Sequence, residues 1–388
     1  MVYRMTEWIE CTLDKLGEIV GGATPSTKCE DYYGGSIPWI TPKDLSSFKG
    51  RYITSGERNI TEKGLASCSA QMMPKAAVLF TSRAPIGYVA IASQSVCTNQ
   101  GFKSIVVNEK ADPLFVYYLL KYNKDAIEAM GSGTTFKEVS GKTMRAVKVR
   151  IPLDVSYQKR IAAVLDSLDT KIENNERIND NLHQQAATLF KALFVDLTPF
   201  DGTMPPNWTI STLGDATEMG AGGDKPKESS PVKTPLCPYP IYSNGINDYG
   251  LYGYTNDPKI KVESVTVSAR GTIGYVCLRH TPYVPIVRLV TLIPDTKVLS
   301  AKYLYLYLRQ LHITGTGTTQ QQLTVPDFRK TEIIIPDKNT MDSFTETVTP
   351  LFEQIWANED ENTKLAEVRD ALLPKLMSGE IDVSDIQL

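Results

Sequence analysis

The chain has 388 residues, of which 42% are hydrophobic and 22% charged, and its formal net charge is −3. This length accommodates two or three domains with cores of their own, and the composition is typical of a soluble globular protein rather than a disordered one. No apolar run approaches the ~18 residues of a membrane span, and six cysteines without a CxxC pair favour reduced thiols, so we expect a cytoplasmic location. Taken as a whole, the negative charge argues against a nucleic-acid binder.

Residues 1–155 predict a compact mixed α/β lobe. They combine Gly, Pro, Thr and Tyr with short β-like runs, at 77–80 and 104–107, and with one predicted helix from Pro113 to Lys124. The next segment, 156–195, is nearly free of Gly and Pro and predicts a long helix. Its heptad residues step alternately by three and four: Leu165, Leu168, Ile172, Asn175, Asn179, Leu182, Ala186, Leu189 and Leu193.

Residues 196–340 predict a second mixed lobe, with a helix from Ser300 to Leu311, and residues 341–388 predict a second long helix followed by a tail. The second helix has the same heptad spacing at Val348, Leu351, Ile355, Asn358, Asn362, Leu365, Arg369, Leu372 and Leu376. Both helices therefore present one side to a partner helix. The alternative is that two amphipathic helices pack on separate globular cores.

Asparagine occupies the same heptad places in both predicted helices. The four residues are Asn175 and Asn179 in the first helix, and Asn358 and Asn362 in the second. Buried asparagines lower stability, but they bond side chain to side chain and thereby fix the register of a coiled coil.

The second half of the chain repeats the first. WIECTL at 8–13 returns as WTISTL at 208–213, TSRAPIGYVA at 81–90 as SARGTIGYVC at 268–277, and GSGTT at 131–135 as GTGTT at 315–319. Because the matches keep their order, we infer a tandem duplication of roughly 190 residues. An approximate two-fold then predicts an α+β fold in which two tandem-repeated mixed α/β lobes are separated by two long antiparallel helices that form a coiled coil. Forty helical residues span ~60 Å, so the helical pair would act as a ruler.

No sequence motif predicts a catalytic or metal site. SGKT at 140–143 resembles the end of a phosphate-binding loop, but Phe136 stands where the first glycine of that motif belongs. Asp327 in PDFRK is expected to be a turn or helix-cap residue, because no second carboxylate-x-Lys follows it closely. GxSxG, HExxH and a GxGxxG after a strand are all missing from the sequence.

The charge is distributed unevenly along the chain. Residues 1–155 carry +4, residues 156–195 carry 0, residues 196–340 carry +1 and residues 341–388 carry −8. The acidity therefore lies in the last helix and tail, while the lobes are mildly basic. This distribution removes the objection to nucleic acid that the net charge raises.

Polar and basic residues on Gly-rich loops and repeated turns are the candidates for DNA contact. Hydroxyl groups and lysines suit phosphate, glutamine can read adenine, and arginine or lysine can read guanine. The candidates are Thr24, Lys28, Arg83, Thr134, Thr135, Lys137, Lys225, Lys227, Arg270, Thr318, Gln320, Gln321 and Gln322. For any single loop residue the alternative is a solvated side chain, and the repeat-equivalent arginines could brace the lobes instead of touching phosphate.

Taken together, the motifs resemble the specificity subunit of type I restriction–modification enzymes. The resemblance covers essentially the whole chain and is carried by VRDALLPKLMSGEI at 368–381, QQAATLFKALFVD at 184–196, SRAPIGYVAIA…TNQGF between 82 and 102, and PPNW…TLGD at 205–215. It implies a non-catalytic DNA reader, in which each lobe is a target recognition domain for one half of a split, asymmetric site.

The resemblance also implies partners. The two helices would set the spacer between the half-sites and bind two methyltransferase subunits, which carry S-adenosylmethionine and methylate adenine. Restriction and translocation subunits would complete the nuclease. The four heptad asparagines would correspond to polar contacts within the helical pair, whereas base-reading residues differ between family members and cannot be transferred.

Two other functions fit parts of the sequence. A repeat-built scaffold without a DNA function would show no salt-dependent DNA binding, whereas a DNA reader loses affinity steeply as salt rises. A self-sufficient DNA enzyme would be active as a purified chain, and the missing catalytic motifs argue against it.

Overall fold

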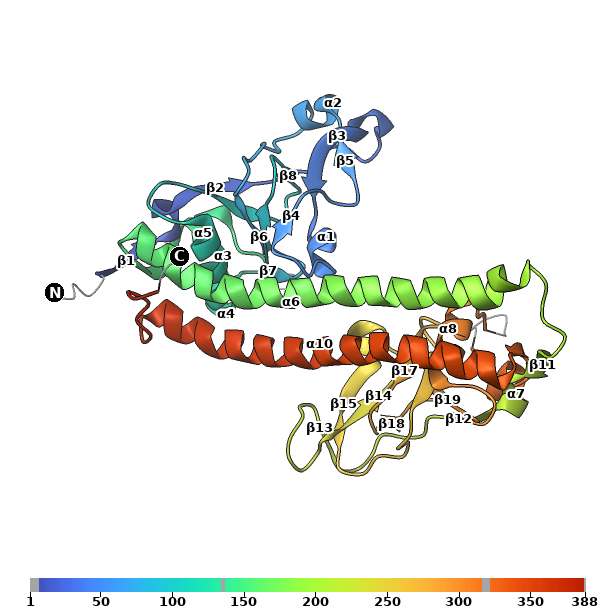
Figure 1. Cartoon of the computed structure of the whole chain (residues 1–388). Coiled ribbons are helices and arrows are strands. Elements are labelled where there is room, and N and C mark those ends of the chain that lie inside the picture. The colour runs from blue at the N-terminus through green and yellow to red at the C-terminus, as the bar shows by residue number, and fades with distance from the viewer. Residues whose placement is uncertain (1–6, 134–136, 316–321, 387–388) are drawn as a thin grey trace. The chain divides into compact units, whose positions relative to one another are not determined.

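The computed structural model describes residues 7–133, 137–315 and 322–386. The chain forms two compact units: unit 1 comprises residues 1–177 and 359–388, and unit 2 comprises residues 178–358 (Figure 1). These units cut across the four predicted segments, because each long helix contributes one part to each unit.

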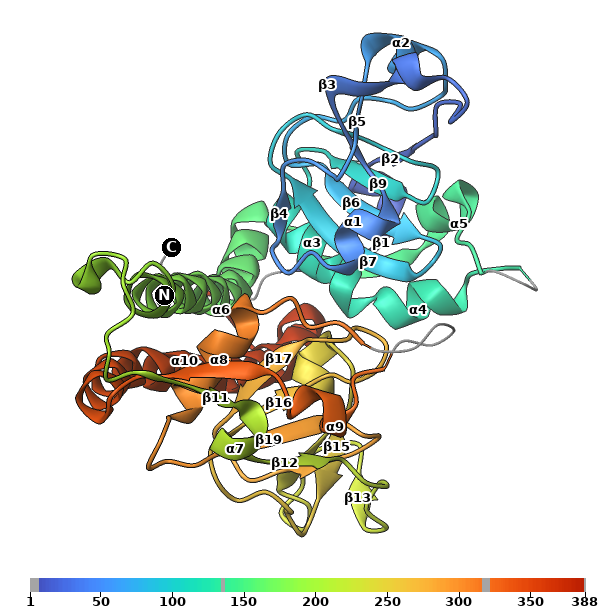
Figure 2. The ribbon, with the colours of Figure 1, turned by 90° about the vertical axis from the view of Figure 1, so that its right-hand side faces the viewer.

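Unit 1 contains a five-stranded sheet, a three-stranded sheet and a two-stranded ribbon. The large sheet has the order β2 (Gly17–Gly21), β9 (Lys103–Val107), β6 (Val78–Ser82), β7 (Ile86–Ala92) and β4 (Tyr52–Ile53). The small sheet has the order β5 (Asn59–Ile60), β3 (Tyr33–Ile40) and β8 (Cys97–Thr98), and the ribbon pairs β1 (Trp8–Thr12) with β10 (Lys148–Pro152). In both views β3 and β5 lie at the end of the lobe farthest from α6 (Figure 1 and Figure 2).

Short helices complete the lobe of unit 1. They are α1 (Pro42–Ser46), α2 (Glu62–Ala66), α3 (Pro113–Tyr122), α4 (Lys124–Ala129) and α5 (Gly141–Ala146), with 3₁₀ turns at Leu13–Lys15 and Glu30–Tyr32. The helix predicted from Pro113 to Lys124 ends two residues earlier, at Tyr122. The side-chain amide of Asn123 donates a hydrogen bond to the Leu119 carbonyl (2.8 Å), and this residue separates α3 from α4.

Unit 2 repeats this architecture. Its first sheet has the order β12 (Thr217–Ala221), β19 (Val290–Pro294), β16 (Ser264–Val267) and β17 (Val276–Arg279), which matches β2-β9-β6-β7 of unit 1. Its second sheet has the order β13 (Ser229–Ser230), β15 (Leu251–Thr255), β14 (Tyr239–Tyr242) and β18 (Val284–Pro285), and a ribbon pairs β11 (Thr209–Thr212) with β20 (Glu332–Ile335). The helices are α7 (Leu213–Ala216), α8 (Ala301–Gln310) and α9 (Val325–Phe328), with 3₁₀ turns at Thr198–Phe200 and Asn247–Gly250.

The two long helices are α6 (Val155–Phe190), which ends in a π-helical turn at Lys191–Val195, and α10 (Lys338–Ser378). In unit 1, Asp169 of α6 bonds Arg369 of α10, and Asn175 bonds Asn362, so residue numbers rise on one helix as they fall on the other. In unit 2, Asn179 bonds Asn358 in the same sense. The helix segments are therefore antiparallel within each unit, and the predicted fold class is confirmed.

Most heptad residues pack as predicted, with Leu165, Ala186, Val348 and Ile355 at most 1% exposed. Leu189 is an exception at 37% exposed. The neighbouring Phe190 is fully buried in its place, four residues after the buried Ala186, and the helix continues from there into the π-helical turn.

Each lobe has a core that includes helix residues. In unit 1, side chains of β6, β9 and α3 pack with Ile161 and Leu165 of α6 and with Leu376 of α10. In unit 2, side chains of β16, β19 and α8 pack with Phe190 and Phe352. Each lobe is therefore continuous with its helix pair. Among the described helices, none is both long and apolar enough to cross a membrane.

Candidate nucleic-acid interface

In each unit a Gly-Gly loop packs tightly against a four-residue turn. In unit 1, a Cβ on Gly22 would lie 2.1 Å from the Thr98 carbonyl oxygen, and Thr24 donates a hydrogen bond to the side chain of Gln100 in the turn Asn99–Phe102. In unit 2, a Cβ on Gly222 would lie 2.7 Å from the backbone nitrogen of Ile286. Only glycine permits so close an approach, which explains why both copies retain it.

Arg83 and Arg270 occupy equivalent turns after β6 and β16, and both bond the same repeat position. Arg83 Nη1 lies 3.5 Å from Oε2 of Glu138, and Arg270 Nη2 donates to Oε1 of Gln322 at 3.2 Å. Both arginines therefore brace a turn, as one of the two predicted alternatives requires. Arg83 nevertheless keeps about a third of its side chain exposed, and Arg270 is exposed.

The Gly-Gly loop, the four-residue turn and the arginine turn meet in each unit. In unit 1, the backbone nitrogen of Ser82 donates to the Gly101 carbonyl at 2.7 Å. In unit 2, the amide of Asn244 stands between the two turns: it accepts from the nitrogen of Ala269 at 2.7 Å and donates to the Val287 carbonyl at 2.6 Å.

We name these two loop clusters by their residues. Surface 1 consists of residues 22–28, Arg83, 99–101 and 137–138, and surface 2 consists of residues 222–227, Arg270, 286–288 and Gln322.

Of the thirteen predicted contact residues, eight lie on these surfaces. Thr24, Lys28, Arg83 and Lys137 are on surface 1, and Lys225, Lys227, Arg270 and Gln322 are on surface 2. Lys28, Lys137 and Lys227 are exposed, and Lys225 lies 5.3 Å over the Tyr252 ring. The remaining five, Thr134, Thr135, Thr318, Gln320 and Gln321, lie outside the described residues.

Sequence reasoning missed Gln100, Asn244 and Arg288. Gln100 lies within the TNQGF motif, but the equivalent turn of unit 2, residues 286–289, has a different sequence. The equivalence follows only from backbone bonds: Asn99 donates to Ile40 at 3.0 Å, and Ile286 donates to Tyr242 at 2.9 Å.

The two motifs that resembled catalytic sites are helix caps. Ser140 of SGKT caps α5 by accepting from the nitrogen of Thr143 (3.0 Å), and Thr324 caps α9 by accepting from the nitrogen of Asp327 (3.3 Å). The hydrogen bond from the Thr324 hydroxyl holds the pKa of Asp327 below its usual range. Asp327 was predicted as a turn or helix-cap residue; it lies in the first turn of α9 and bonds the capping residue Thr324, which is itself the cap. In the described part of the chain, no cluster of His, Cys, Asp and Glu could hold a metal ion.

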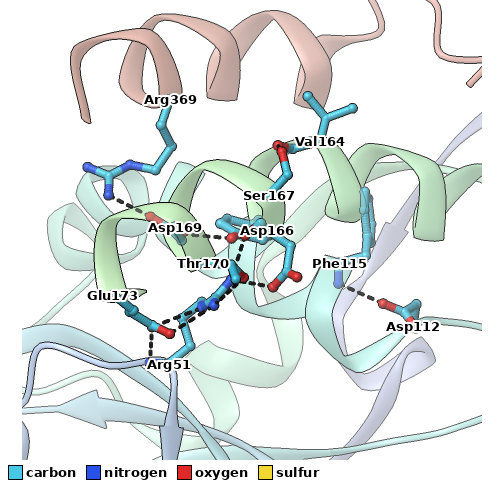
Figure 3. Close-up of polar contacts among 11 residues, drawn as sticks. Arg51, Asp112, Phe115, Val164, Asp166, Ser167, Asp169, Thr170, Glu173 and Arg369 are labelled. Atoms are coloured by element: carbon cyan, nitrogen blue, oxygen red, sulfur yellow. Dashed lines mark hydrogen bonds and ion pairs between the residues drawn. The ribbon is translucent and has the colours of Figure 1, made fainter. Parts of the chain in front are cut away.

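A buried arginine anchors the lobe of unit 1 to α6. Arg51 is 5% exposed and directly precedes β4, facing the helix (Figure 3). Its guanidinium donates to both carboxylate oxygens of Glu173 (3.1 and 3.0 Å), to the Thr170 hydroxyl (2.9 Å) and to the carbonyl and carboxylate of Asp166. All five N–H donors of the guanidinium group can be used in this geometry, which lysine cannot reproduce.

A second charged contact lies beside the first on α6. Asp169 is 6% exposed, and its carboxylate accepts from the Tyr118 hydroxyl (2.7 Å) and from Arg369 of α10 (2.7 Å, Figure 3). The carboxylate thus joins α3, α6 and α10. Together with Arg51 it fixes how the lobe of unit 1 sits on its own helix pair.

Unit 2 uses aromatic side chains at the corresponding helix positions. Trp356, which is equivalent to Glu173 by the asparagine register, stacks on His280 at 4.1 Å. The ammonium group of Lys302 lies 5.5 Å over the Trp356 ring and 2.9 Å from Glu263. Phe352 stands at the place of Asp169 and contacts His183 edge to face. The two lobes therefore share a fold but are anchored by different chemistry.

A family model described as "Type I restriction modification DNA specificity domain" matches residues 5–184 and 205–367, one copy for each half of the chain. The chain is also 34% identical to the type I restriction enzyme MjaIX specificity subunit of Methanocaldococcus jannaschii, over 98% of this chain and 95% of that protein. The chain belongs to this family.

Other specificity subunits are similar over shorter spans or in fold. The HindI specificity subunit of Haemophilus influenzae is 25% identical over 72% of this chain and 80% of its own. The crystal structure of a type I S subunit from M. genitalium shares the fold, with a TM-score of 0.61 and 16% identity over 97% of both chains. As a specificity subunit, the chain has a DNA-recognition role in a type I restriction–modification complex and is not itself an enzyme.

Proposed function

We propose that each unit reads one half of a bipartite, asymmetric DNA site. One observation carries this proposal: the two surfaces have the same loop architecture but present different side chains. Surface 1 offers Gln100, Gly101 and Glu138, whereas surface 2 offers Val287, Arg288 and Gln322 at the corresponding positions. Two surfaces with the same backbone arrangement but different exposed side chains suit two different half-sites.

The exposed groups on these surfaces match the chemistry of double-stranded DNA. Lysines and threonines on the Gly-Gly loops suit phosphate oxygens, which position a protein on the duplex. Glutamine amides pair with the N6 and N7 edge of adenine, and arginines pair with the O6 and N7 edge of guanine in the major groove. The lobes' charges of +4 and +1 are small, so we infer that partner subunits contribute much of the salt-dependent affinity.

The long helices are proposed to set the spacer and to recruit methyltransferase subunits. The segment 341–388 carries −8, and helix residues such as Ile178, Leu189 and Val368 are 37–48% exposed. The acidity of the last segment and the exposed apolar side chains of both helices suit a protein partner rather than DNA. By this proposal two methyltransferase subunits carry S-adenosylmethionine and methylate adenine, restriction and translocation subunits complete the nuclease, and the complex works in the cytoplasm.

The test is coexpression of the full chain with the methyltransferase subunit of its own restriction–modification system, followed by genome-wide mapping of methylated adenines. The expected result is one motif with two specified halves and an unspecified spacer of fixed length, which disappears when this chain is omitted. A methylation pattern that does not depend on the chain would contradict the proposal. A non-DNA scaffold would, in addition, show no salt-dependent retention of DNA by the purified complex.

A further inference from the structure

The turn 286–289, whose first three residues belong to surface 2, is held in an unfavourable backbone conformation. Val287 (φ 52°) and Arg288 (φ 60°) are both left-handed, and both side chains are exposed. A left-handed β-branched residue is a genuine outlier, and such strain persists only where the surroundings impose it.

Three hydrogen bonds impose this conformation. The nitrogen of Val287 donates to Gly223 at 2.9 Å, the nitrogen of Arg288 donates to Gly222 at 2.8 Å, and the Val287 carbonyl accepts from the side chain of Asn244 at 2.6 Å. The backbone is satisfied inward, so the valine and arginine side chains point to solvent. Because both side chains are exposed, the strain of this turn is not offset by burial of apolar surface in the core.

A second left-handed pair lies a few residues after Asn244. Asp248 (φ 47°) and Tyr249 (φ 54°) form the tip of a loop that closes where Ser243 donates to the Gly250 carbonyl at 2.8 Å. The buried Arg279 supports this tip by donating to the Tyr249 carbonyl at 2.7 Å, with its guanidinium 3.6 Å from the Tyr242 ring centre. A costly buried cation thus holds an exposed loop tip, on which the Tyr249 side chain is 53% exposed.

Asn244 links these loops to the arginine turn. Its side-chain oxygen accepts from the nitrogen of Ala269, directly before Arg270, while its nitrogen donates to Val287. In unit 1 the equivalent turns touch directly, through Ser82 and Gly101, and Pro42 packs against Gly101 where Asn244 stands in unit 2. One amide side chain therefore sets the distance between Arg270 and Arg288.

We propose that the two strained loops and the arginine turn of unit 2 form a single double-stranded DNA contact surface, in which Arg270 and Arg288 are contact residues and Asn244 is the positioning residue. This inference rests on the proposed function. Arginine can bond guanine or phosphate, and the Val287 side chain suits the methyl group of thymine. The amide determines the half-site by fixing where the two guanidinium groups lie.

The experiment uses the full chain in complex with its methyltransferase partner, and compares N244A, N244D and R288A with the control K297A. Lys297 is exposed but lies beyond the far end of β19, about 15 Å from the turn at 3.3 Å per strand residue. Adenine methylation is mapped for each variant, and DNA affinity is measured as a function of salt with an oligonucleotide carrying the wild-type motif.

N244A and N244D are expected to relax or change the half-site of unit 2 only. N244A should leave the salt dependence unaltered, because the Asn244 side chain bonds the Val287 carbonyl and the Ala269 nitrogen and carries no charge. R288A is expected either to relax the same half-site or to reduce the slope of log affinity against log salt by about one. K297A should leave the motif unchanged.

An unchanged motif in folded N244A and N244D complexes would overturn the positioning role, and changes in both half-sites would show general damage instead. If neither Asn244 variant folds, R288A decides: an unchanged motif with an unchanged salt slope overturns the contact surface. Failure of the proposed function is distinguishable from all of these, since the wild-type complex would then give no bipartite motif.

Discussion

At the residue scale, Arg51 provides the main polar attachment between the lobe of unit 1 and α6. Replacement by methionine keeps the apolar stem but leaves Asp166 and Glu173 without their cation. Breaking a buried ion pair in this way costs about 3 kcal/mol, because a charge stays behind in a poorly solvated place. We expect R51M to lower the free energy of unfolding of unit 1 by that order, measured by urea denaturation of the full chain.

The neighbouring Lys49 provides the matched control. Its ammonium group lies 3.8 Å from Glu176 on the same helix, but its side chain is 79% exposed. An exposed pair of this kind contributes 1 kcal/mol or less, at about the limit of detection. K49M should therefore unfold at nearly the wild-type urea concentration, and equal losses in K49M and R51M would contradict the anchoring role of Arg51.

The buried His183 should make the free energy of unfolding of unit 2 depend on pH. Burial, together with the positive charge of Arg309, lowers the pKa of His183, and its Nδ1 has no hydrogen-bond partner among the described residues. The unfolded chain binds this proton near the ordinary pKa of ~6.5, whereas the folded chain binds it only at lower pH. Lowering the pH through ~6.5 should therefore reduce the free energy of unfolding of unit 2, until the folded form is also protonated.

The measurement is chemical denaturation of wild type and H183F between pH 5 and pH 8. The phenylalanine variant should lose part of the destabilisation at acid pH, whereas H312F, at an exposed histidine, should keep it. An identical pH profile for H183F and wild type would show that the acid sensitivity arises elsewhere.

At the element scale, the asparagine pairs of α6 and α10 confirm the predicted register. Nδ2 of Asn358 donates to Oδ1 of Asn179 at 2.7 Å, and Nδ2 of Asn175 donates to Oδ1 of Asn362 at 2.9 Å. Asn179 is 8% exposed and Asn358 is 5% exposed. The heptad pattern could predict these contacts because a three–four spacing fixes which helix positions face a partner.

Removing one amide of the pair should cost more than removing both. N358L leaves the Asn179 oxygen buried without its donor, which costs about 1–3 kcal/mol, whereas N179L/N358L replaces both partners with apolar groups. We expect the double variant to recover most of the stability that N358L loses in urea denaturation, with N181L as an exposed control. Additive losses in the double variant would mean that the two amides do not interact.

The elements that sequence patterns predicted less well depend on local detail. The break between α3 and α4 follows from one asparagine, Asn123, that bonds its own helix. The sequence alone does not tell whether such a side chain lies within a helix or at its end. The π-helical turn at 191–195 depends on packing of Phe190 and Phe194 with Tyr303, more than a hundred residues away. Local periodicity contains no information about that contact.

At the scale of the whole molecule, the duplication made the fold predictable but not the complete site. Matching motifs placed Arg83 and Arg270 at equivalent turns, and the structure confirms that equivalence through Glu138 and Gln322. Asn244 could not be found in this way, because Pro42 holds its place in unit 1. Its role depends on two long-range hydrogen bonds that leave no repeated sequence signal.

Helix length should set the spacer of the DNA site. One extra heptad in both α6 and α10, inserted after residues 177 and 358, keeps the coiled-coil register and adds ~10.5 Å to each helix. At 3.4 Å per base pair, the spacer should widen by about 3 bp. Methylation mapping of this variant gives the answer, and an unchanged spacer with both half-sites retained would exclude the helices as the ruler.

Each lobe, by the proposed function, reads its half-site independently. This independence is tested most directly by a chain in which the lobe of unit 2, residues 209–335, is replaced by a second copy of residues 8–152, joined at the equivalent ribbons β11–β20 and β1–β10. Adenine methylation is mapped in complex with the methyltransferase partner. We predict a motif built from the unit 1 half-site twice, with the unit 2 half-site lost. A folded complex that still methylates the unit 2 half-site would contradict it.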